Sequence, residues 1–412
     1  MSRPARRVAL ELLREWEQGD TYAADLIEER VRKQVLSQND RPLLQQLVYT
    51  VIRNRTLLDH LVKELTDGKL DPKTKRVLRL GIAEVLFMES PAHAAVNETV
   101  KLANGWAKGV VNAVLRRALA EKEEIEKRVG SLPPAIRLSI PEFLWKRWKR
   151  DFGEYDAIAL GEWNQRPSPV YLRINTLRKE TQALQDVSPV PSDPDYLCAH
   201  GALPKKAIQE GQVYAQDPST ALAIRMLDPQ AGDRVLDACA APGGKTFAIA
   251  CRMKDQGSIL AADSSPRRVE RMSENLKRLG VQSSKTATIN WLELNDAQRE
   301  ELGQFSKALV DVPCSNTGVI RRRIDVRWRL GKRDFEELAK LQFDILSSVS
   351  SAIALGGKFI YSTCSIDREE NEGVVEQFLL KNPQFALISM EAVLPWRDGF
   401  DGAFAALLAR ES

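Results

Sequence analysis

Two cysteines carry the chemistry that this sequence suggests first. Cys314 lies in the segment 311–315, Asp-Val-Pro-Cys-Ser, and Cys364 lies in the segment 361–365, Tyr-Ser-Thr-Cys-Ser. Each follows a short run typical of a buried strand, so each is expected at the carboxyl edge of a sheet. If the two strands are neighbours, they lie about 4.8 Å apart and both sulfurs line one pocket. Cysteine is also a common small buried residue, but the proline, serine and threonine neighbours indicate turns.

A glycine-rich loop forms a second group of candidate residues. The segment 237–246 reads Asp-Ala-Cys-Ala-Ala-Pro-Gly-Gly-Lys-Thr and follows a predicted strand. Small residues let the backbone approach a ligand closely, and the next helix directs its first N–H groups toward that ligand. A phosphate loop would need glycine where Cys239 stands, and the dinucleotide pattern G-x-G-x-x-G is missing. A nucleotide triphosphatase is therefore disfavoured.

Asp263 ends the next predicted strand, about 20 residues after the glycines, where a carboxylate can accept both hydroxyls of a ribose. The loop and this acid, without a phosphate fingerprint, favour a nucleoside that carries no phosphates. S-adenosylmethionine fits that description. Taken alone, Asp263 is equally suited to cap a helix that begins at Pro266.

Two thiols beside such a cofactor suit methylation of a cytosine ring. C5 of cytosine is not nucleophilic until a thiolate adds at C6, and the enamine-like C5 can then attack a sulfonium methyl group. Afterwards the C5 proton must leave and the thiolate must be expelled. One cysteine explains the first step and a second explains help with the last. Asp311 is expected to hydrogen-bond the N3/N4 edge as negative charge develops there.

These residues together resemble the Sun-type (Nop2/Sun) RNA cytosine-5 methyltransferases, in particular the subgroup that acts on bacterial small-subunit ribosomal RNA. The resemblance extends over nearly the whole chain, and its helical start resembles the NusB-type RNA-binding domain of that subgroup. The segments that carry the resemblance are 96–98, 111–116, 173–176, 214–219, 237–246, Asp263, 311–315 and 361–366. DNA cytosine-5 enzymes share the Pro-Cys pair, whereas the Thr-Cys pair at 363–364 favours RNA.

The resemblance implies a role for each matching residue. Cys364 would be the nucleophile and Cys314 the thiol that assists product release, with Asp311 beside them. RNA would be the partner, and S-adenosyl-L-methionine would be the cofactor. The residues implied to hold it are Cys239, Ala240, Ala241, Pro242, Gly243, Gly244, Lys245, Asp263, Arg268 and Asp311.

The chain also departs from the family pattern in three places. Leu292 stands where the family usually carries an acid that contacts the adenosine. The segment 321–328 lacks the His-Pro that often precedes its aspartate, although its four arginines suit a phosphate track. The segment 401–408 is looser than the family's aromatic ending. None of these departures removes the two thiols.

Composition limits the class of protein. The chain has 412 residues, a net charge of +4, and five cysteines without a CxxC pair. This pattern argues against a disulfide framework and a zinc site, and three scattered histidines argue against histidine catalysis. No apolar stretch approaches a membrane span, and Met1 to Arg7 lead into an amphipathic pattern rather than a signal peptide. We expect a cytoplasmic protein without a metal, and nothing requires more than a monomer.

The hydrophobic patterning of the sequence predicts three domains. Helical periodicity predicts an all-α, NusB-like domain over 1–127, and Pro133-Pro134 breaks the chain. A small α+β module is expected over 133–212, in which alternating Trp and Lys/Arg at 145–150 suit either base stacking or a helix core. From 213 to 412, strands alternate with helices, which indicates a Rossmann-like α/β methyltransferase domain. The strands are expected at 234–238, 258–262, 286–290, 308–312 and 358–362.

Two other functions are compatible with the same residues. A DNA cytosine-5 methyltransferase would use Cys314 as its nucleophile and would not need Cys364. A non-catalytic RNA-binding or assembly factor would act through the helical domain and the basic segments, and neither thiol would matter.

Overall fold

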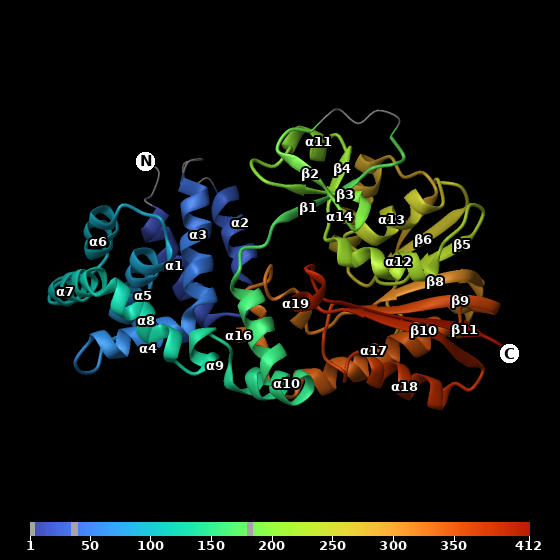
Figure 1. The fold of residues 1–412 in the computed structure, drawn as a ribbon. Helices are drawn as coiled ribbons and strands as arrows, with labels where there is room; N and C mark the ends of the chain where they lie inside the picture. Colours follow the sequence, from blue (N-terminus) through green and yellow to red (C-terminus); the bar gives the residue numbers. More distant parts are fainter. Residues whose placement is uncertain (1–4, 34–39, 179–183) are drawn as a thin grey trace. The chain divides into compact units, whose positions relative to one another are not determined.

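The computed structural model describes residues 5–33, 40–178 and 184–412, so the first four residues of the predicted start lie outside it (Figure 1). The chain divides into two compact units. The helical unit holds the chain up to Arg166 together with Arg323–Arg329, and the catalytic unit holds Pro167–Arg322 and Leu330–Ser412. No helix in the described ranges is both long enough and apolar enough to cross a membrane.

The helical unit is built from amphipathic helices whose apolar faces meet in one core. The first helix buries a face with helical spacing from Val8 to Trp16 and stops before Gly19. Asp71 caps the fifth helix by accepting hydrogen bonds from the N–H groups of Lys73 and Thr74 at 2.9 and 3.0 Å, as an aspartate before a first-turn proline typically does. The helices are α1 (Ala5–Gln18), α2 (Ala23–Arg32), α3 (Asp40–Arg53), α4 (Arg55–Leu65), α5 (Pro72–Phe87), α6 (Ala92–Val100), α7 (Ala107–Ala120), α8 (Lys122–Ser131), α9 (Pro134–Arg137), α10 (Glu142–Gln165) and α16 (Val326–Arg329).

The structure divides the chain at a different place from the expected boundary at Pro133-Pro134. Helices α9 and α10 belong to the helical unit, because the Leu57 N–H donates to Ser139 Oγ at 3.0 Å and the Gln165 amide donates to the Arg53 carbonyl at 3.4 Å. The tryptophans of α10 settle the question left open by the sequence. Trp145 and Trp148 are buried, so they belong to the core rather than to a base-stacking surface.

A short segment from far along the chain completes the helical unit. Asp325 Oδ2 accepts hydrogen bonds from Trp16 Nε1 at 3.3 Å and from the Ala23 N–H at 2.6 Å. Trp328 Nε1 donates to the Ile52 carbonyl at 2.9 Å. The helical unit is therefore discontinuous in sequence.

A small antiparallel sheet opens the catalytic unit. Its strand order is β2-β3-β1-β4, and Asn175 ties it to the neighbouring helix by donating to the carbonyls of Gly211 at 2.7 Å and Leu279 at 2.8 Å. The strand part of the expected 133–212 module therefore packs with the methyltransferase sheet. Its elements are β1 (Val170–Ile174), β2 (Val187–Val190), β3 (Asp193–Ala199), β4 (Val213–Ala215) and α11 (Lys205–Gln209).

A seven-stranded sheet forms the centre of the catalytic unit, in the order β10-β11-β9-β8-β5-β6-β7. Strands β5 to β9 are parallel, and β11 runs antiparallel between β9 and β10. All five predicted strands are present, but the third, fourth and fifth begin two, three and five residues earlier than expected. The strands are β5 (Arg234–Asp237), β6 (Ser258–Asp263), β7 (Ser284–Thr288), β8 (Phe305–Asp311), β9 (Ile353–Thr363), β10 (Phe385–Val393) and β11 (Ala403–Arg410).

Helices cover both faces of this sheet (Figure 1). Because side chains alternate along a strand, Val235 and Leu309 pack against α12 and α13, whereas Leu236 and Val310 face α17 and α18. The strand order reverses at β5, which places the crevice typical of doubly wound sheets at the carboxyl ends of β5 and β8. The helical elements are η1 (Pro218–Thr220), α12 (Ala221–Leu227), α13 (Gly244–Arg252), α14 (Pro266–Leu279), α15 (Asp296–Leu302), η2 (Thr317–Val319), α17 (Asp334–Ser350), α18 (Glu372–Lys381) and α19 (Pro395–Asp398).

Candidate functional site

The two cysteines lie side by side at the carboxyl edge of the large sheet. Parallel strands β8 and β9 pair with Asp311 opposite Ser362, and the chain turns out of the sheet after each. The Sγ atoms of Cys314 and Cys364 are 3.3 Å apart, and both residues are partly buried. The sequence left open whether their strands are neighbours, and the pairing of β8 with β9 shows that they are.

Asn316 joins the two cysteine turns. Cys364 Sγ donates to Asn316 Oδ1 at 3.3 Å, and Asn316 Nδ2 donates to the Cys314 carbonyl at 2.7 Å. The φ angle of Asn316 is 60°, a left-handed conformation that asparagine tolerates better than most residues. Sequence reasoning missed this residue, because an asparagine two positions after a cysteine has no distinctive pattern.

The pKa of the Cys314 thiol is raised well above its ordinary value. The hydrogen bond with Cys364 is the largest cause, burial is the second, and negative charge on Cys364 and Glu370 adds to both. Cys314 therefore keeps its proton at neutral pH while Cys364 is free of any covalent bond.

The loop 239–245 leads from β5 into α13. Gly243 has a φ of 99°, which favours glycine, and its N–H donates to the Ala240 carbonyl at 2.7 Å. A Cβ on Gly244 would lie 2.8 Å from a ring carbon of Tyr214, so no larger residue fits there. The two glycines keep the loop tight and let the first turn of α13 face the carboxyl edge of the sheet.

Lys245 and Asp311 form an ion pair between the loop and the strand that carries Cys314. The Lys245 Nζ atom lies 2.6 Å from Asp311 Oδ2. Burial lowers the pKa of Lys245, but the charge and hydrogen bond of Asp311 outweigh it, so the pKa is raised overall. Lys245 is therefore a cation at neutral pH.

Asp263 ends β6 and is almost fully buried. Its Oδ1 accepts a hydrogen bond from the Ser265 N–H at 3.1 Å, and its Oδ2 lies 3.2 Å from Arg268. Arg268 also donates to the Ala241 carbonyl at 2.9 Å. Asp263 therefore supports the start of α14 through Ser265 and contacts the arginine that holds the loop, whereas its contact with a ribose stays a prediction.

Most of the loop lines one pocket of about 360 Å³. Of the predicted cofactor residues, Cys239 to Pro242, Gly244, Lys245 and Asp311 line it, whereas Gly243, Asp263 and Arg268 do not. A hollow of about 60 Å³ is lined by Lys245 and Cys364. Lys245 therefore lines both spaces, which brings the nucleophile candidate next to the loop pocket.

Asp237, at the end of β5, puts a buried carboxyl group in the wall of this pocket. Its Oδ2 accepts a hydrogen bond from Thr246 Oγ1 at 2.7 Å, while Oδ1 has no partner among the described residues. Burial raises the pKa of Asp237 to about 7. A buried carboxyl group that forms no ion pair among the described residues suits a positively charged ligand, and the pocket therefore fits the sulfonium and amino groups of S-adenosylmethionine. Asp237 is the first residue of the glycine-rich segment 237–246, but its residue type and position in the sequence do not indicate that its side chain is buried in the pocket wall.

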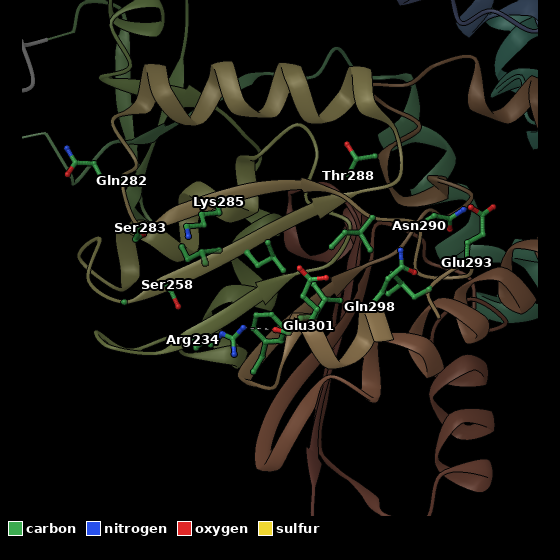
Figure 2. Close-up of a pocket in the computed structure, with 17 residues that line it drawn as sticks. Arg234, Ser258, Gln282, Ser283, Lys285, Thr288, Asn290, Glu293, Gln298 and Glu301 are labelled. Carbon is green, nitrogen blue, oxygen red and sulfur yellow. Dashed lines mark hydrogen bonds between the residues drawn. The ribbon is translucent and has the colours of Figure 1, made fainter. Parts of the chain in front are cut away.

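A larger pocket lies elsewhere, along β6, β7 and α15. Its volume is about 990 Å³, and polar side chains such as Lys285, Gln298 and Glu301 line it (Figure 2). Neither a cysteine nor any residue of the loop 239–245 belongs to its wall. This pocket is larger than the one at the loop. The loop residues and Cys364, however, line the smaller spaces, so the smaller pocket is the better candidate for the reaction site.

The predicted phosphate track at 321–328 is wrong for two of its arginines. Arg322 donates to Asp217 Oδ2 at 2.5 Å and is also paired with Asp401, so its charge is neutralised within the catalytic unit. Arg327 is buried in the helical unit, where it donates to the carbonyls of Leu138 and Asn164 at 3.3 Å. Burial lowers the pKa of Arg327 to about 9.

The position of the missing family acid is occupied by an exposed leucine. Leu292 is 49% exposed, and its N–H donates to Asn290 Oδ1 at 3.2 Å. Its side chain offers no polar atom to an adenosine.

Comparison with known proteins agrees with this geometry. The family model described as 16S rRNA methyltransferase RsmB/F matches residues 224–407, and the model of the NusB family matches residues 3–120. A probable ribosomal RNA small subunit methyltransferase B of Bacillus subtilis is 32% identical over 95% of this chain and 91% of its own length. The ribosomal RNA small subunit methyltransferase B of Vibrio cholerae is 34% identical over 92% of each chain.

A solved structure agrees as well. The crystal structure of PH0851 superimposes with a TM-score of 0.78, at 25% identity and over 100% of both chains. The relatives above match along nearly their whole length. The chain therefore belongs to the 16S rRNA methyltransferase RsmB/F family, enzymes that use S-adenosyl-L-methionine to methylate ribosomal RNA.

Proposed function

We propose that this enzyme methylates C5 of a cytosine in small-subunit ribosomal RNA, with Cys364 as the nucleophile and Cys314 as the thiol that assists release. The observation that carries the proposal is the 3.3 Å distance between the two Sγ atoms at the carboxyl edge of the sheet. One nucleophile alone would explain addition to the ring. A second sulfur in contact with the first supports a reaction in which a proton must also be removed.

The reaction begins when the Cys364 thiolate forms a bond to C6 and pushes electrons toward C5 and N3. Bound S-adenosylmethionine supplies the methyl group that C5 takes up. Cys314, as its thiolate, then removes the C5 proton. The electrons of the broken C5–H bond form the C5–C6 double bond, the Cys364–C6 bond breaks, and Cys364 leaves as a thiolate. One proton is released to solvent in each cycle.

The coupling between the sulfurs explains why Cys314 becomes a base only after the adduct has formed. The hydrogen bond to Cys364 and the Cys364 charge are among the main causes that raise the pKa of Cys314. Both causes disappear when Cys364 becomes a thioether. The pKa of Cys314 then falls, and the thiolate needed for proton removal becomes accessible.

The Lys245–Asp311 ion pair is suited to stabilise the negative charge that develops on the cytosine ring when Cys364 adds to C6. Asp311 lines the cofactor pocket from the strand that precedes Cys314, and its carboxylate is suited to accept a hydrogen bond from the exocyclic amino group of cytosine. The Lys245 ammonium, 2.6 Å from that carboxylate, offsets the negative charge that develops on the ring. Asp263 and Arg268 support the cofactor through the loop backbone, since Arg268 holds the Ala241 carbonyl.

We further propose that the helical unit, which includes the expected domain 1–127, binds RNA, and that the catalytic unit, which includes most of the expected domain 213–412, carries out the reaction. The mechanism needs neither a metal ion nor a second copy of the chain, so a monomer suffices. It does need two reduced thiols. All five cysteines are free, which supports a reducing compartment, namely the cytoplasm.

Three proteins test the mechanism: wild type, Cys364→Ala and Cys314→Ala, with Cys198→Ala as the control for loss of a thiol in the small sheet. Each is incubated with unmodified small-subunit ribosomal RNA and methyl-labelled S-adenosylmethionine, and denaturing gels then separate free RNA from protein-linked RNA. We expect label in free RNA only with wild type and Cys198→Ala. Cys364→Ala should form no adduct, and Cys314→Ala should accumulate one because release fails.

Two results would replace this assignment. If Cys364→Ala still methylates while Cys314→Ala does not, the roles of the thiols are reversed, as in a DNA-type enzyme. If both single variants methylate like wild type, neither thiol is catalytic and the reaction must use another nucleophile.

A further inference from the structure

A buried carboxylate stands behind the two cysteine turns, and the mechanism above does not use it. Glu370 is fully buried. Its Oε1 accepts hydrogen bonds from the Ser315 N–H and from Gln342 Nε2, both at 2.8 Å. Its Oε2 accepts from Ser365 Oγ at 2.6 Å and also from Ser315 Oγ. The acceptor capacity of both oxygens is thus filled by four donors.

The donors of Glu370 identify what it connects. Ser315 directly follows Cys314, and Ser365 directly follows Cys364. The turn after β8 and the turn after β9 therefore meet on one carboxylate. Gln342, on α17, donates in addition to the Pro313 carbonyl at 2.9 Å, so the same side chain network fixes the residue before Cys314 as well.

The neighbour of Glu370 in sequence strengthens the second turn. Asn371 Nδ2 donates to the Ser365 carbonyl at 3.0 Å, and Thr363 Oγ1 donates to Asn371 Oδ1 at 2.6 Å. Both residues that flank Cys364 are thereby held by the segment 370–371. The segment lies at the start of α18, where it is anchored by the core of the catalytic unit.

Glu370 is stabilised by dipoles rather than by a cation. No lysine or arginine in the described part of the chain forms an ion pair with it; its partners are one backbone N–H, one amide and two hydroxyl groups. Such a carboxylate depends on donors in fixed positions, because losing any of them leaves a buried charge poorly solvated. The donors are in turn held in place by the carboxylate.

We propose that Glu370 is a positioning residue for methyl transfer, which ties the two cysteine turns together and keeps the Cys314 and Cys364 sulfurs in contact. The proposal rests on the two-thiol mechanism above. Without Glu370, the turns keep weaker links such as the contact of Asn316 with Cys364 and that of Ser315 with Ser365, but they lose the one charged acceptor shared by both, and Cys314 shifts from its place beside the adduct. An error of about 1 Å in such a placement is enough to lower a rate by about 100-fold.

Two variants of Glu370 separate the effect of its hydrogen bonds to the two cysteine turns from the effect of its negative charge. Glu370→Ala removes all four contacts. Glu370→Gln can keep them, since its carbonyl oxygen can face Ser315 N–H and Gln342 while its amide group donates to the two serine hydroxyls. Glu84→Gln is the matched control, because Glu84 is an equally buried acid in the helical unit. We expect kcat to fall about 100-fold in Glu370→Ala with KM for the RNA within about threefold, and to stay within about fivefold of wild type in Glu370→Gln.

A second readout measures the sulfur contact without any methyl transfer. Oxidised glutathione can convert two adjacent thiols to one disulfide, with release of two reduced glutathione molecules. Mass spectrometry of peptides from wild type, Glu370→Gln and Glu84→Gln should reveal mainly a Cys314–Cys364 disulfide. Glu370→Ala should instead carry separate glutathione adducts on the two cysteines. If Glu370→Ala fails to fold, as judged by circular dichroism, Ser365→Ala removes one tie only and should give about a tenfold drop in kcat with a lower disulfide yield.

Measuring both kcat and the disulfide yield tests the positioning role of Glu370 separately from the two-thiol mechanism. A Glu370→Ala protein with wild-type kcat and wild-type disulfide yield would overturn the proposal. It would also be overturned if Glu370→Gln lost activity as fully as Glu370→Ala while both formed the disulfide normally, because the charge and not the tie would then matter. If instead Cys364→Ala proved active, the two-thiol mechanism would fail, yet the disulfide yields would still report whether Glu370 holds the sulfurs together.

Discussion

The helical unit and the catalytic unit bury charge in different ways. In the helical unit, buried Glu84 is paired with Arg6, whose Nε lies 2.9 Å from Oε2. Arg79 is similarly held by Glu17 at 2.6 Å and by Asp59 at 2.7 Å. Buried Asp325 and Arg327 of the same unit have neutral hydrogen-bond partners instead, but Glu84 and Arg79 each contact an opposite charge. Such pairs are strongly destabilising to break, because one partner is left alone.

In the catalytic unit, buried acids outnumber the cations that face them. Asp237 has one hydroxyl partner, and its pKa is raised to about 7 by burial. Burial and the charge of Asp217 raise the pKa of Asp401 to about 6, although Arg322 contacts it. Glu370 has no cation in the described residues. The difference teaches that stability and ligand binding favour opposite charge arrangements: the buried ion pairs stabilise the helical unit, whereas Asp237 leaves a carboxyl group beside the pocket that we propose for a cationic cofactor.

The strongest test of this comparison breaks a neutralised pair. Glu84→Gln should lower the free energy of unfolding by about 3 kcal/mol, the lower end for a broken buried ion pair because Arg6 keeps some contact with solvent. Methyl transfer at a temperature where the variant is folded should be unchanged. Urea unfolding measures the first quantity. Glu64→Gln, which breaks the surface contact with Arg128, should cost less than about 1 kcal/mol, and equal losses in the two variants would contradict the comparison.

Removing the buried, unpaired carboxyl group of Asp237 should increase stability, whereas breaking the Glu84 pair should lower it. Asp237→Asn can keep the hydrogen bond from Thr246 but removes a poorly solvated carboxylate, so the free energy of unfolding at pH 8 should rise. The Kd for S-adenosylmethionine should weaken about thirtyfold, equivalent to about 2 kcal/mol of lost attraction to a cation. Calorimetric titration gives both Kd values. Asp228→Asn, at an exposed acid of the same unit, should bind like wild type; a destabilised Asp237→Asn protein with normal affinity would refute the comparison.

A smaller effect should appear on changing pH. Since the folded-state pKa of Asp237 is about 7 and the ordinary value is about 4, the folded protein binds this proton more tightly than the unfolded chain. The stability of the ligand-free protein should therefore fall as pH rises from about 4 to 7. Affinity for the cationic cofactor should change in the other direction and improve about tenfold from pH 6 to pH 8, because only the ionised acid attracts it. The Asp237→Asn variant should lack this pH dependence of Kd.

Much of the fold follows from local pattern. The apolar runs before the loop and before Cys314 and Cys364 correctly predicted β5, β8 and β9, because a buried parallel strand is short, apolar and followed by a turn. Adjacency of β8 and β9 then follows from the doubly wound arrangement. Small residues at 240–244 predicted a tight loop for the same kind of local reason.

Other features of the fold and the site depend on contacts between residues far apart in the sequence, so no local sequence pattern predicts them. Glu370 follows another glutamate and resembles an exposed acid in sequence, yet its hydrogen-bond partner Ser315 is 55 positions away. Arg322 and Arg327 resemble phosphate ligands until their buried partners are known. Helix α10 looked like part of a separate module, because only tertiary packing reveals which core receives Trp145 and Trp148.

The discontinuity of the helical unit has a consequence for translation. Trp16 and Ala23 emerge early from the ribosome, but Asp325, which accepts hydrogen bonds from both, is made only after some 300 further residues. At roughly 5–20 residues per second, this leaves a delay on the order of ten seconds or more. The nascent helices must wait through the synthesis of β1 to β8 before their last segment arrives. A fragment that stops at Arg166 would lack that segment permanently, so the two units are expected to mature together rather than one after the other.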